Sequence, residues 1–298
     1  MPDELTPTTR QESPLRDREP RVEVLLEALP YIREFAGATI VIKYGGAAMT
    51  TPELKASFAR DVALLKLVGM NPVVVHGGGP DISRYSDRLG LEVRFVQGLR
   101  VTDAPTMELV KMVLVGKINK EIVAQLHVAG VSAVGLAGDD GGLILAEKAS
   151  SPDADLGFVG RVAAIDPRVL ERLRDFVPVV ASVGVDADGQ SYNINADTVA
   201  GGLAAALGAR KAIFLTDVEG IYRDIADPAS LISECRLDDL RDLIASGTVG
   251  AGMIPKLAAV TDALESGVGA AHVVDGRVPH SVLLELFTEV GIGTKITA

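Results

Sequence analysis

The sequence has 298 residues, of which 48% are hydrophobic and 23% are charged, and its net charge is −11. This length predicts a globular protein with a large core, built as one α/β domain or as two lobes. A nucleic-acid partner is not expected, because such a surface needs clustered basic residues. The single cysteine, Cys235, excludes an intrachain disulfide and a cysteine-based zinc cluster.

The first 20 residues carry no signal-peptide pattern, since they are polar and charged without an apolar stretch. No apolar run in the chain is long enough and unbroken enough to cross a bilayer. We therefore expect a cytoplasmic protein without a membrane partner. Because residues 1–20 are rich in proline and charge, they are expected to form a disordered tail.

Residues 21–36 include VEVLLEALPYIREF, whose apolar positions follow helical spacing. Pro30 lies inside this pattern and should kink or split the helix. The helix precedes the first strand of the predicted core, so we expect it to protrude. It then packs either on its own domain or on another subunit.

Strands and helices alternate along the rest of the chain. Strands are predicted at 39–46, 72–79, 131–138, 177–185, 211–220 and 271–276, and helices at 52–69, 104–129, 195–208, 254–267 and 281–287. LILAEK and FVGRVAAI indicate an inserted antiparallel hairpin. The alternation predicts an α/β three-layer sandwich: a largely parallel central sheet with helices on both faces.

Ligands of such sheets bind at the carboxyl ends of the strands. Four loops are expected there: KYGG, HGGGP, SVGVDADGQSYNINAD and LTDVEGIY. The glycines after the second strand let backbone N–H groups approach an anion at the start of a helix. Neither GxGxxG nor GxxxxGK[ST] occurs, which argues against a dinucleotide-binding dehydrogenase and a P-loop kinase. His76 is predicted to be a buried histidine with satisfied hydrogen bonds rather than a catalyst.

Two lysines stand where an anion would explain them. Lys43 ends a predicted buried strand, where a cation is costly unless it meets an anion; the alternative is that its ammonium reaches the rim. Lys256 opens a helix, although helix N-termini favour negative charge. A bound anion at that terminus would account for Lys256.

Three polar residues, Asn193, Asn195 and Asp197, lie where the NINAD loop becomes a helix. Such residues commonly cap helices, so one of them is expected to be a cap. Three within five positions indicate more than capping. Arg100, after a predicted turn, is suited to clamp a carboxylate with two hydrogen bonds, unless it is simply an exposed arginine.

The motifs KYGG, HGGGP, GLRVT, NINAD, LTDVEG, AGMIPK and GIGT, in this order, resemble the amino-acid kinase family over residues 22–298. The resemblance is strongest to its arginine-inhibited members that phosphorylate N-acetyl-L-glutamate. It implies an N-terminal lobe, residues 37–190, for the acyl amino acid and dimerisation. It also implies a C-terminal lobe, residues 191–298, for ATP and arginine.

The implied reaction moves the γ-phosphoryl group of ATP, supplied with Mg²⁺, to the side-chain carboxylate of N-acetyl-L-glutamate in arginine biosynthesis. No dedicated metal site is expected. The resemblance implies catalysis by Lys43, Lys256 and Asp197, acyl-substrate binding by Gly78, Gly79, Arg100, Asn193 and Asn195, and nucleotide binding by Gly45, Gly46, Thr216, Asp217, Tyr222 and Lys256.

The same resemblance implies feedback inhibition by L-arginine and a homohexamer, a trimer of dimers joined by the helix at 21–36. The residues that match the arginine site are Tyr31, Lys211, His272, Glu285, Gly291 and Gly293. Some relatives bind a PII-type signalling protein, and no residue decides whether this chain does.

Other functions stay open at this point. Within the enzyme class, the alternatives are kinases of N-acetylaminoadipate, glutamate, aspartate or carbamate, because one methylene in a pocket contributes only about 1–3 kcal/mol to discrimination. From another class, a non-catalytic arginine sensor would fit the regulatory motifs. The presence of Lys43, Lys256 and Asp197 together favours an active enzyme.

Overall fold

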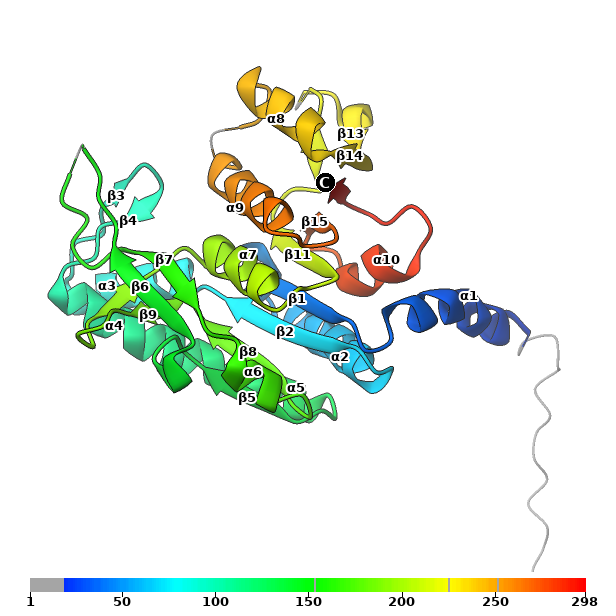
Figure 1. The fold of residues 1–298 in the computed structure, drawn as a ribbon, viewed down its shortest axis with the longest axis horizontal. Helices are drawn as coiled ribbons and strands as arrows, with labels where there is room; N and C mark the ends of the chain where they lie inside the picture. Colours follow the sequence, from blue (N-terminus) through cyan, green and yellow to red (C-terminus); the bar gives the residue numbers. More distant parts are fainter. Residues whose placement is uncertain (1–18, 153, 225, 251) are drawn as a thin grey trace, which may run out of the picture.

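The computed structural model describes residues 19–298 except residues 153, 225 and 251. Its centre is an eight-stranded sheet in the order β14-β16-β15-β11-β1-β2-β8-β5 (Figure 1). The strands are β1 Thr39–Tyr44, β2 Asn71–His76, β5 Ala133–Leu136, β8 Val177–Ala181, β11 Lys211–Thr216, β14 Glu234–Arg236, β15 Ala271–Asp275 and β16 Thr294–Thr297. Neighbours pair in parallel except β15 and β16. The predicted, largely parallel sheet is confirmed.

Helices cover both faces of this sheet, as an α/β sandwich requires. One face packs on α2 Pro52–Leu67, α5 Asn119–Val128 and α10 Ser281–Phe287, and the other on α7 Ala196–Ala206 and α9 Ile254–Glu265. Within β1, Ile40 and Ile42 join the first hydrophobic core and Val41 joins the second. This alternation follows from the two-residue period of a strand.

A second, four-stranded sheet has the order β10-β9-β6-β7. Its strands are β6 Ile144–Lys148, β7 Gly160–Ile165, β9 Val183–Val185 and β10 Ser191–Asn193. The predicted antiparallel hairpin is confirmed as β6 and β7. The prediction of one strand at 177–185 was wrong, because Ser182 separates β8 in the main sheet from β9 in this one. The residues of β10 were predicted to be loop.

The predicted helix at 104–129 forms with a change of pitch. It consists of α4 Ala104–Lys111, a π-helical segment Met112–Ile118 and α5. Segments of this kind are rare and occur often at functional sites.

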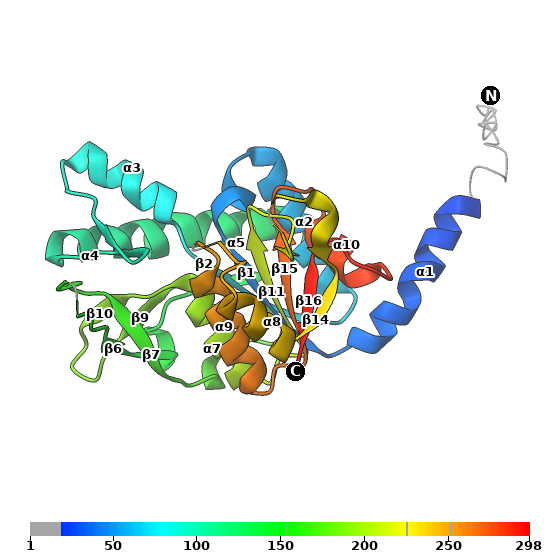
Figure 2. The same cartoon turned by 90° about the horizontal axis from the view of Figure 1, so that it is seen from above.

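The N-terminal helix α1, Glu19–Phe35, points away from the body at the end opposite α3 and α4 (Figure 2). The helix continues through Pro30, so the prediction that Pro30 could split it is wrong. Pro30 is exposed, and water can therefore reach the carbonyl that proline leaves without a hydrogen bond. The helix begins two residues earlier than predicted, and residues 1–18 of the predicted tail lie outside the described residues. Tyr31 meets Phe287 of α10 edge to face, with 6.5 Å between ring centroids.

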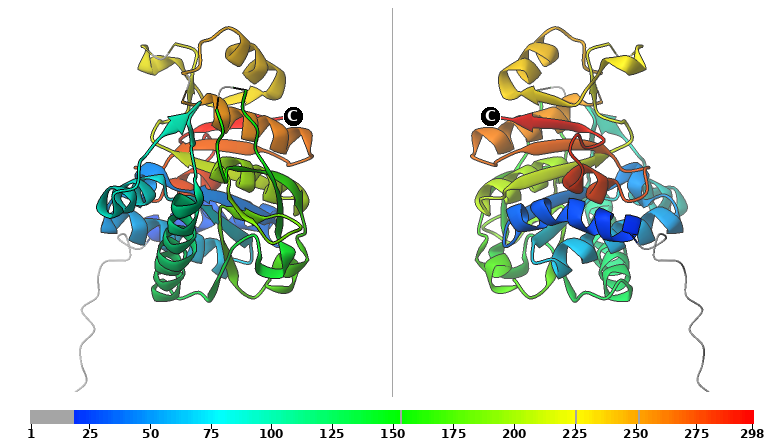
Figure 3. Two further views of the ribbon diagram at one scale, coloured as in Figure 1. Left: turned by 90° about the vertical axis from the view of Figure 1, so that its left-hand side faces the viewer. Right: turned by 90° about the vertical axis from the view of Figure 1, so that its right-hand side faces the viewer.

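The remaining elements are short. They are α3 Gly79–Leu89, β3 Phe95–Val96, β4 Leu99–Arg100, α6 Arg168–Arg172, α8 Leu237–Ala245, β12 Ile221–Tyr222, β13 Leu231–Ile232 and the 3₁₀ turns Gly46–Met49, Asp140–Gly142 and Pro228–Ser230. The segment containing α8, yellow to orange, lies beyond one edge of the sheet in both end-on views (Figure 3). Within the described ranges, no helix is long and apolar enough to span a membrane.

Candidate active site and a second charged cavity

Lys43, Lys256 and Asp197 meet at the carboxyl ends of the central strands. The ammonium of Lys43, from β1, lies 3.2 Å from Oδ1 of Asp197. The ammonium of Lys256, from α9, lies 3.0 Å from the same oxygen. All three side chains are nearly buried. One carboxylate oxygen therefore holds two cations from different segments together.

The charges of this cluster follow from burial and from each other. Burial alone would raise the pKa of Asp197, but the two ammoniums hold it below its usual value. Burial lowers the pKa of Lys256, and Lys43 adds to that effect while Asp197 opposes it. Two cations and one carboxylate leave an excess positive charge in a desolvated place, which favours an anionic ligand.

Asn195 is the helix cap, which the sequence placed only among Asn193, Asn195 and Asp197. Its side-chain oxygen accepts hydrogen bonds from the backbone N–H groups of Asp197, at 2.7 Å, and Thr198, at 3.4 Å. The cap fixes the first turn of α7, which carries the Asp197 carboxylate. The position of the carboxylate between the lysines therefore depends on local helix capping.

A cavity of about 230 Å³ opens beside this cluster and contains the predicted acyl-substrate residues. Arg100 reaches its wall with Nη2 donating to the Gly79 carbonyl at 3.1 Å and to Ser83 Oγ at 2.7 Å. Asn193 Nδ2 donates to Thr102 Oγ1 at 3.2 Å. Its lining includes Lys43, Gly45, Gly46, Gly78, Gly79, Arg100, Asn193, Asn195 and Asp197.

Gly78 must be a glycine for steric reasons. A Cβ atom there would lie 2.3 Å from Ile118 Cδ1 and 2.7 Å from Leu114 Cδ2. Both of these side chains belong to the π-helical segment. The segment therefore packs directly under the glycine loop, and a larger residue at position 78 would displace one from the other.

A second cavity, of about 850 Å³, is lined by all three residues of the lysine cluster, Lys43, Asp197 and Lys256. Thr216 and Asp217, at the end of β11, line it, and Thr216 Oγ1 donates to Asp217 Oδ1 at 3.2 Å. Tyr222 is not in its lining; the Tyr222 hydroxyl donates to Glu219 at 2.6 Å. The two cavities share six lining residues: Lys43, Gly45, Gly46, Gly98, Asn195 and Asp197.

Sequence reasoning missed several residues of these two cavities. Ser182 lines the smaller cavity, and Gly250 and Met253 line the larger one. The glycine-rich GTVGAGMIP before Lys256 was a usable signal for the last two. Nothing in the apolar run around Ser182 marks it, because its position results from the division between β8 and β9.

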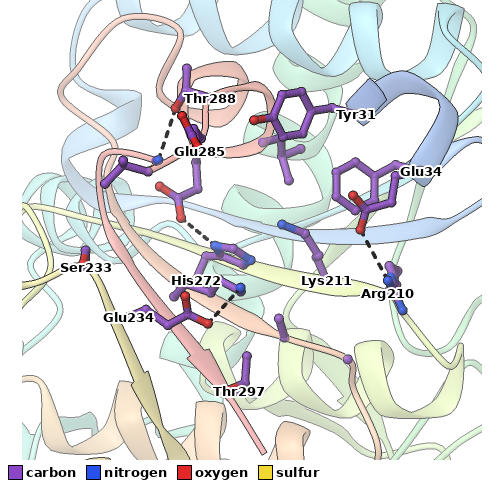
Figure 4. Close-up of a pocket in the computed structure, with 18 residues that line it drawn as sticks. Tyr31, Glu34, Arg210, Lys211, Ser233, Glu234, His272, Glu285, Thr288 and Thr297 are labelled. Carbon is purple, nitrogen blue, oxygen red and sulfur yellow. Dashed lines mark hydrogen bonds and ion pairs between the residues drawn. The ribbon is translucent and has the colours of Figure 1, made fainter. Parts of the chain in front are cut away.

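The residues predicted for arginine meet at a separate cavity of about 530 Å³, between α1, β11, β15 and α10 (Figure 4). Tyr31, Lys211, His272, Glu285 and Gly291 line it. Gly293 is not in the lining, but its backbone N–H donates to Glu285 Oε2 at 2.9 Å.

Glu285 is the most constrained group of this cavity. His272 Nδ1 lies 2.5 Å from Glu285 Oε1, and the Ile292 N–H donates to Oε2 at 2.8 Å. Burial alone would raise the pKa of Glu285, and these partners hold it below its usual value. Burial lowers the pKa of His272, whose Nε2 is buried without a partner among the described residues. Burial likewise lowers the pKa of Lys211, against the attraction of Glu285.

Within residues 19–298, the described positions contain no group of three or more His, Cys, Asp or Glu side chains able to hold a metal ion.

The sequence profile of the amino acid kinase family matches residues 38–275. This chain belongs to the amino acid kinase family. Among curated members, the acetylglutamate kinase of Heliobacterium modesticaldum is 56% identical over 284 residues, which cover 92% of this chain and 96% of that protein. The acetylglutamate kinase of Nostoc sp. is 55% identical, covering 93% of each chain. The prediction that the chain belongs to this family is confirmed, and so is the prediction that it is a kinase.

Among solved structures, N-acetylglutamate synthase from Neisseria gonorrhoeae, complexed with coenzyme A and N-acetyl-glutamate, superposes with a TM-score of 0.83 at 25% identity. The match covers 93% of this amino acid kinase family member but only 63% of the synthase. The synthase chain is thus considerably longer than the part that resembles this fold.

Proposed function

We propose that this protein transfers the γ-phosphoryl group of ATP to the side-chain carboxylate of N-acetyl-L-glutamate and that L-arginine inhibits it. The observation that carries the catalytic part is that the two cavities meet at Lys43 and Asp197, while Lys256, bonded to Asp197, lines the larger one. A group transfer between two ligands needs two adjacent sites, so that the reacting ends of the bound ligands are in contact. The names of the 53–56% identical relatives support this choice of acceptor.

The chemistry needs charge stabilisation rather than a base. An acceptor carboxylate is ionised at neutral pH and is already the nucleophile. The barrier comes from bringing two anions together and from the charge on the transferring phosphoryl group. Lys43 and Lys256, approaching from β1 and α9, would hold phosphoryl oxygens between them. Asp197, ionised and bonded to both, would keep the ammoniums in position and protonated.

The smaller cavity suits an acyl amino acid. Arg100 brings a guanidinium to its wall. Its hydrogen bonds to described residues use Nη2, so the other donors of the fork can bind a substrate carboxylate. Asn193 adds an amide oxygen and nitrogen for a polar acyl group. The N–H groups of Gly78 and Gly79 at the start of α3 would face anionic oxygen.

The larger cavity suits the nucleotide. Gly45 and Gly46 follow Lys43 directly, and Gly46 has a φ of +58°, a conformation that favours glycine. Their backbone N–H groups would face the phosphates, and Mg²⁺ would arrive bound to ATP. Thr216 and Asp217 line the same space, whereas Tyr222 stays a predicted contact outside the lining.

The test is ATP-dependent acyl-phosphate formation, trapped with hydroxylamine. N-acetyl-L-glutamate would be compared with N-acetylaminoadipate, glutamate, aspartate and carbamate. We expect strong preference for N-acetyl-L-glutamate. Preference for another acceptor would overturn the substrate and retain the phosphoryl-transfer chemistry. Arginine binding without turnover of any acceptor would favour a non-catalytic sensor.

The cavity between α1 and α10 supports L-arginine as the inhibitor. Glu285 offers a buried carboxylate to a guanidinium. His272 Nε2, which has no partner in the described part of the chain, offers a lone pair, since Nδ1 holds the proton toward Glu285. Lys211 could meet the carboxylate end of the ligand. Titration of the full chain with L-arginine by calorimetry, with L-citrulline as the uncharged control, tests this assignment. Equal binding of both would contradict it.

Because α1 forms one wall of that cavity and protrudes, we further propose that it joins subunits in a hexamer and links assembly to inhibition. The exposure of Leu26 and Leu29 on α1, 59% and 41%, supports an apolar contact between subunits. Light scattering of the purified chain, with and without arginine, measures the assembly. A PII-type protein stays a possible partner that a pull-down would test.

A further inference from the structure

His76 is the last residue of β2 and lies directly before the glycine loop. Its side chain is fully buried. Asn119 Nδ2 lies 3.2 Å from its Nε2, and the Gly77 carbonyl oxygen lies 3.1 Å from its Nδ1. The prediction of a buried histidine with both ring nitrogens satisfied is confirmed.

The tautomer of this ring follows from its partners. An amide nitrogen only donates hydrogen bonds, so Nε2 must accept from Asn119. The ring proton then lies on Nδ1 and is donated to the Gly77 carbonyl. Burial lowers the pKa of His76 to about 4, so the ring is neutral at physiological pH and carries one proton.

The orientation of the Asn119 amide is itself fixed by other contacts. Its Nδ2 also donates to the Val179 carbonyl, at 2.8 Å, in β8. Its Oδ1 accepts from Lys120 Nζ at 3.2 Å. Exchanging the amide oxygen and nitrogen would place an oxygen against a carbonyl, so this orientation is the only one that satisfies all partners.

The direction of one peptide group follows. In a trans peptide, the C=O of one residue and the N–H of the next point in opposite directions. The Gly77 carbonyl bonds to the buried ring, so the Gly78 N–H points away from it. Gly77 and Gly78 both line the smaller cavity. In the described part of the chain, the Gly78 N–H has no protein acceptor.

We propose that His76, held in its Nδ1–H tautomer by Asn119, is a positioning residue that sets the Gly77–Gly78 peptide so that the Gly78 N–H faces the acceptor. The ligand group is an anionic or carbonyl oxygen of the acceptor substrate. The inference rests on the proposed phosphoryl transfer and adds two residues, His76 and Asn119, that touch neither substrate. Their effect reaches the reaction only through the glycine peptide.

Two similar substitutions separate positioning from packing. In His76→Asn, the side-chain amide occupies the place of Nδ1 and can still donate to the Gly77 carbonyl. In His76→Gln, the amide occupies the place of Nε2 and leaves that carbonyl without its donor. Both variants replace the buried imidazole with a smaller amide side chain, so the loss of packing is similar in the two. The exposed His127→Gln provides a matched control.

We expect His76→Gln to lower kcat/KM for the acceptor by about tenfold or more, in line with a misplaced backbone donor. The KM for ATP should change by less than about twofold, and His76→Asn should restore most of the lost rate. The acceptor used is whichever one the wild-type chain phosphorylates. Equal losses in both variants, or lower melting temperatures with unchanged kinetics, would overturn the proposal.

A measurement on the unsubstituted protein makes the inference independent of folding. Selective ¹⁵N labelling of the four histidines gives each ring its tautomer by NMR. The NMR signals of His76 are assigned by their absence from the spectrum of a His76 variant. We expect this ring to be neutral, with the proton on Nδ1, across the neutral pH range. A proton on Nε2 would refute the mechanism even if the chain is an active kinase. Conversely, absence of any kinase activity with the proton on Nδ1 would reject the function and leave the peptide geometry intact.

Discussion

The lysine cluster and the cavity beside α1 both bury charged groups, but their charges balance differently. At the cluster, two ammoniums share one oxygen of Asp197. Beside α1, the carboxylate of Glu285 has His272 and two backbone N–H groups as partners. The first region has surplus positive charge, whereas the second holds a carboxylate that accepts three hydrogen bonds from the protein and has room for a further donor.

The difference teaches that burial alone does not select a ligand, whereas the sign of the unbalanced charge does. The cavity beside α1 has both signs in its lining: Glu34, Glu234, Glu285 and Glu289, with Arg210, Lys211 and Lys295. Such a lining suits a zwitterionic ligand with an extra cation. The lysine cluster suits phosphate oxygens. Four experiments test this contrast.

The largest effect is expected at the lysine cluster. Lys43→Ala and Lys256→Ala should each lower kcat by at least about 10²-fold, because each removes a donor that stabilises transition-state charge. Steady-state kinetics with ATP and N-acetyl-L-glutamate measures this, with exposed Lys148→Ala as control. Near-normal turnover in both variants would contradict the catalytic assignment.

The next effect concerns the acidic side of the comparison. Glu285→Gln keeps the shape and the acceptor for backbone N–H groups but removes the charge. The arginine concentration for half-inhibition should rise by about tenfold or more, as for a lost hydrogen bond to a charged group. Glu289→Gln, an exposed change in the same lining, serves as the control. An equal shift in both variants would argue against a specific role for Glu285.

Removal of residues 1–36 tests the wall that α1 provides. We expect loss of the proposed hexamer, and the proposed inhibition by arginine should weaken by roughly several-fold, because the cavity loses Tyr31 and Glu34 together. Light scattering and inhibition curves measure both effects. Removal of residues 1–18 alone keeps the helix and is the control. If the chain without residues 1–36 is still a hexamer with unchanged sensitivity to arginine, α1 is not responsible for assembly or for inhibition.

The smallest effect is a shift in pH dependence at the cluster. Burial and Lys43 lower the pKa of Lys256, and the Asp197 carboxylate raises it. In Asp197→Asn the raising influence is lost, so Lys256 should release its proton at a lower pH. Activity that needs the ammonium will then decline earlier as pH rises. The alkaline side of the kcat–pH profile, compared with wild type, measures the shift; an unmoved profile would exclude Asp197 from this role.

Much of the fold could be predicted because it depends on local pattern. Apolar runs that end in glycine predicted the central strands, and one helix cap was expected among Asn193, Asn195 and Asp197. The division at Ser182 could not be predicted, since the run 177–185 is apolar throughout and no residue in it marks a change of sheet. The π-helical segment at Met112–Ile118 was equally hidden within a helical pattern.

The sequence by itself determined which chemical groups this protein has: two lysines, an aspartate and an arginine beside glycine loops, and a separate set around Glu285. Only the tertiary structure decided that Lys43 and Lys256 meet one oxygen of Asp197 and that the His76 ring lies between the Asn119 amide and the Gly77 carbonyl. The physical reason is that hydrogen bonds and ion pairs act over a few ångströms. Residues far apart in sequence come within that range only when β1, α7 and α9 converge at one edge of the sheet.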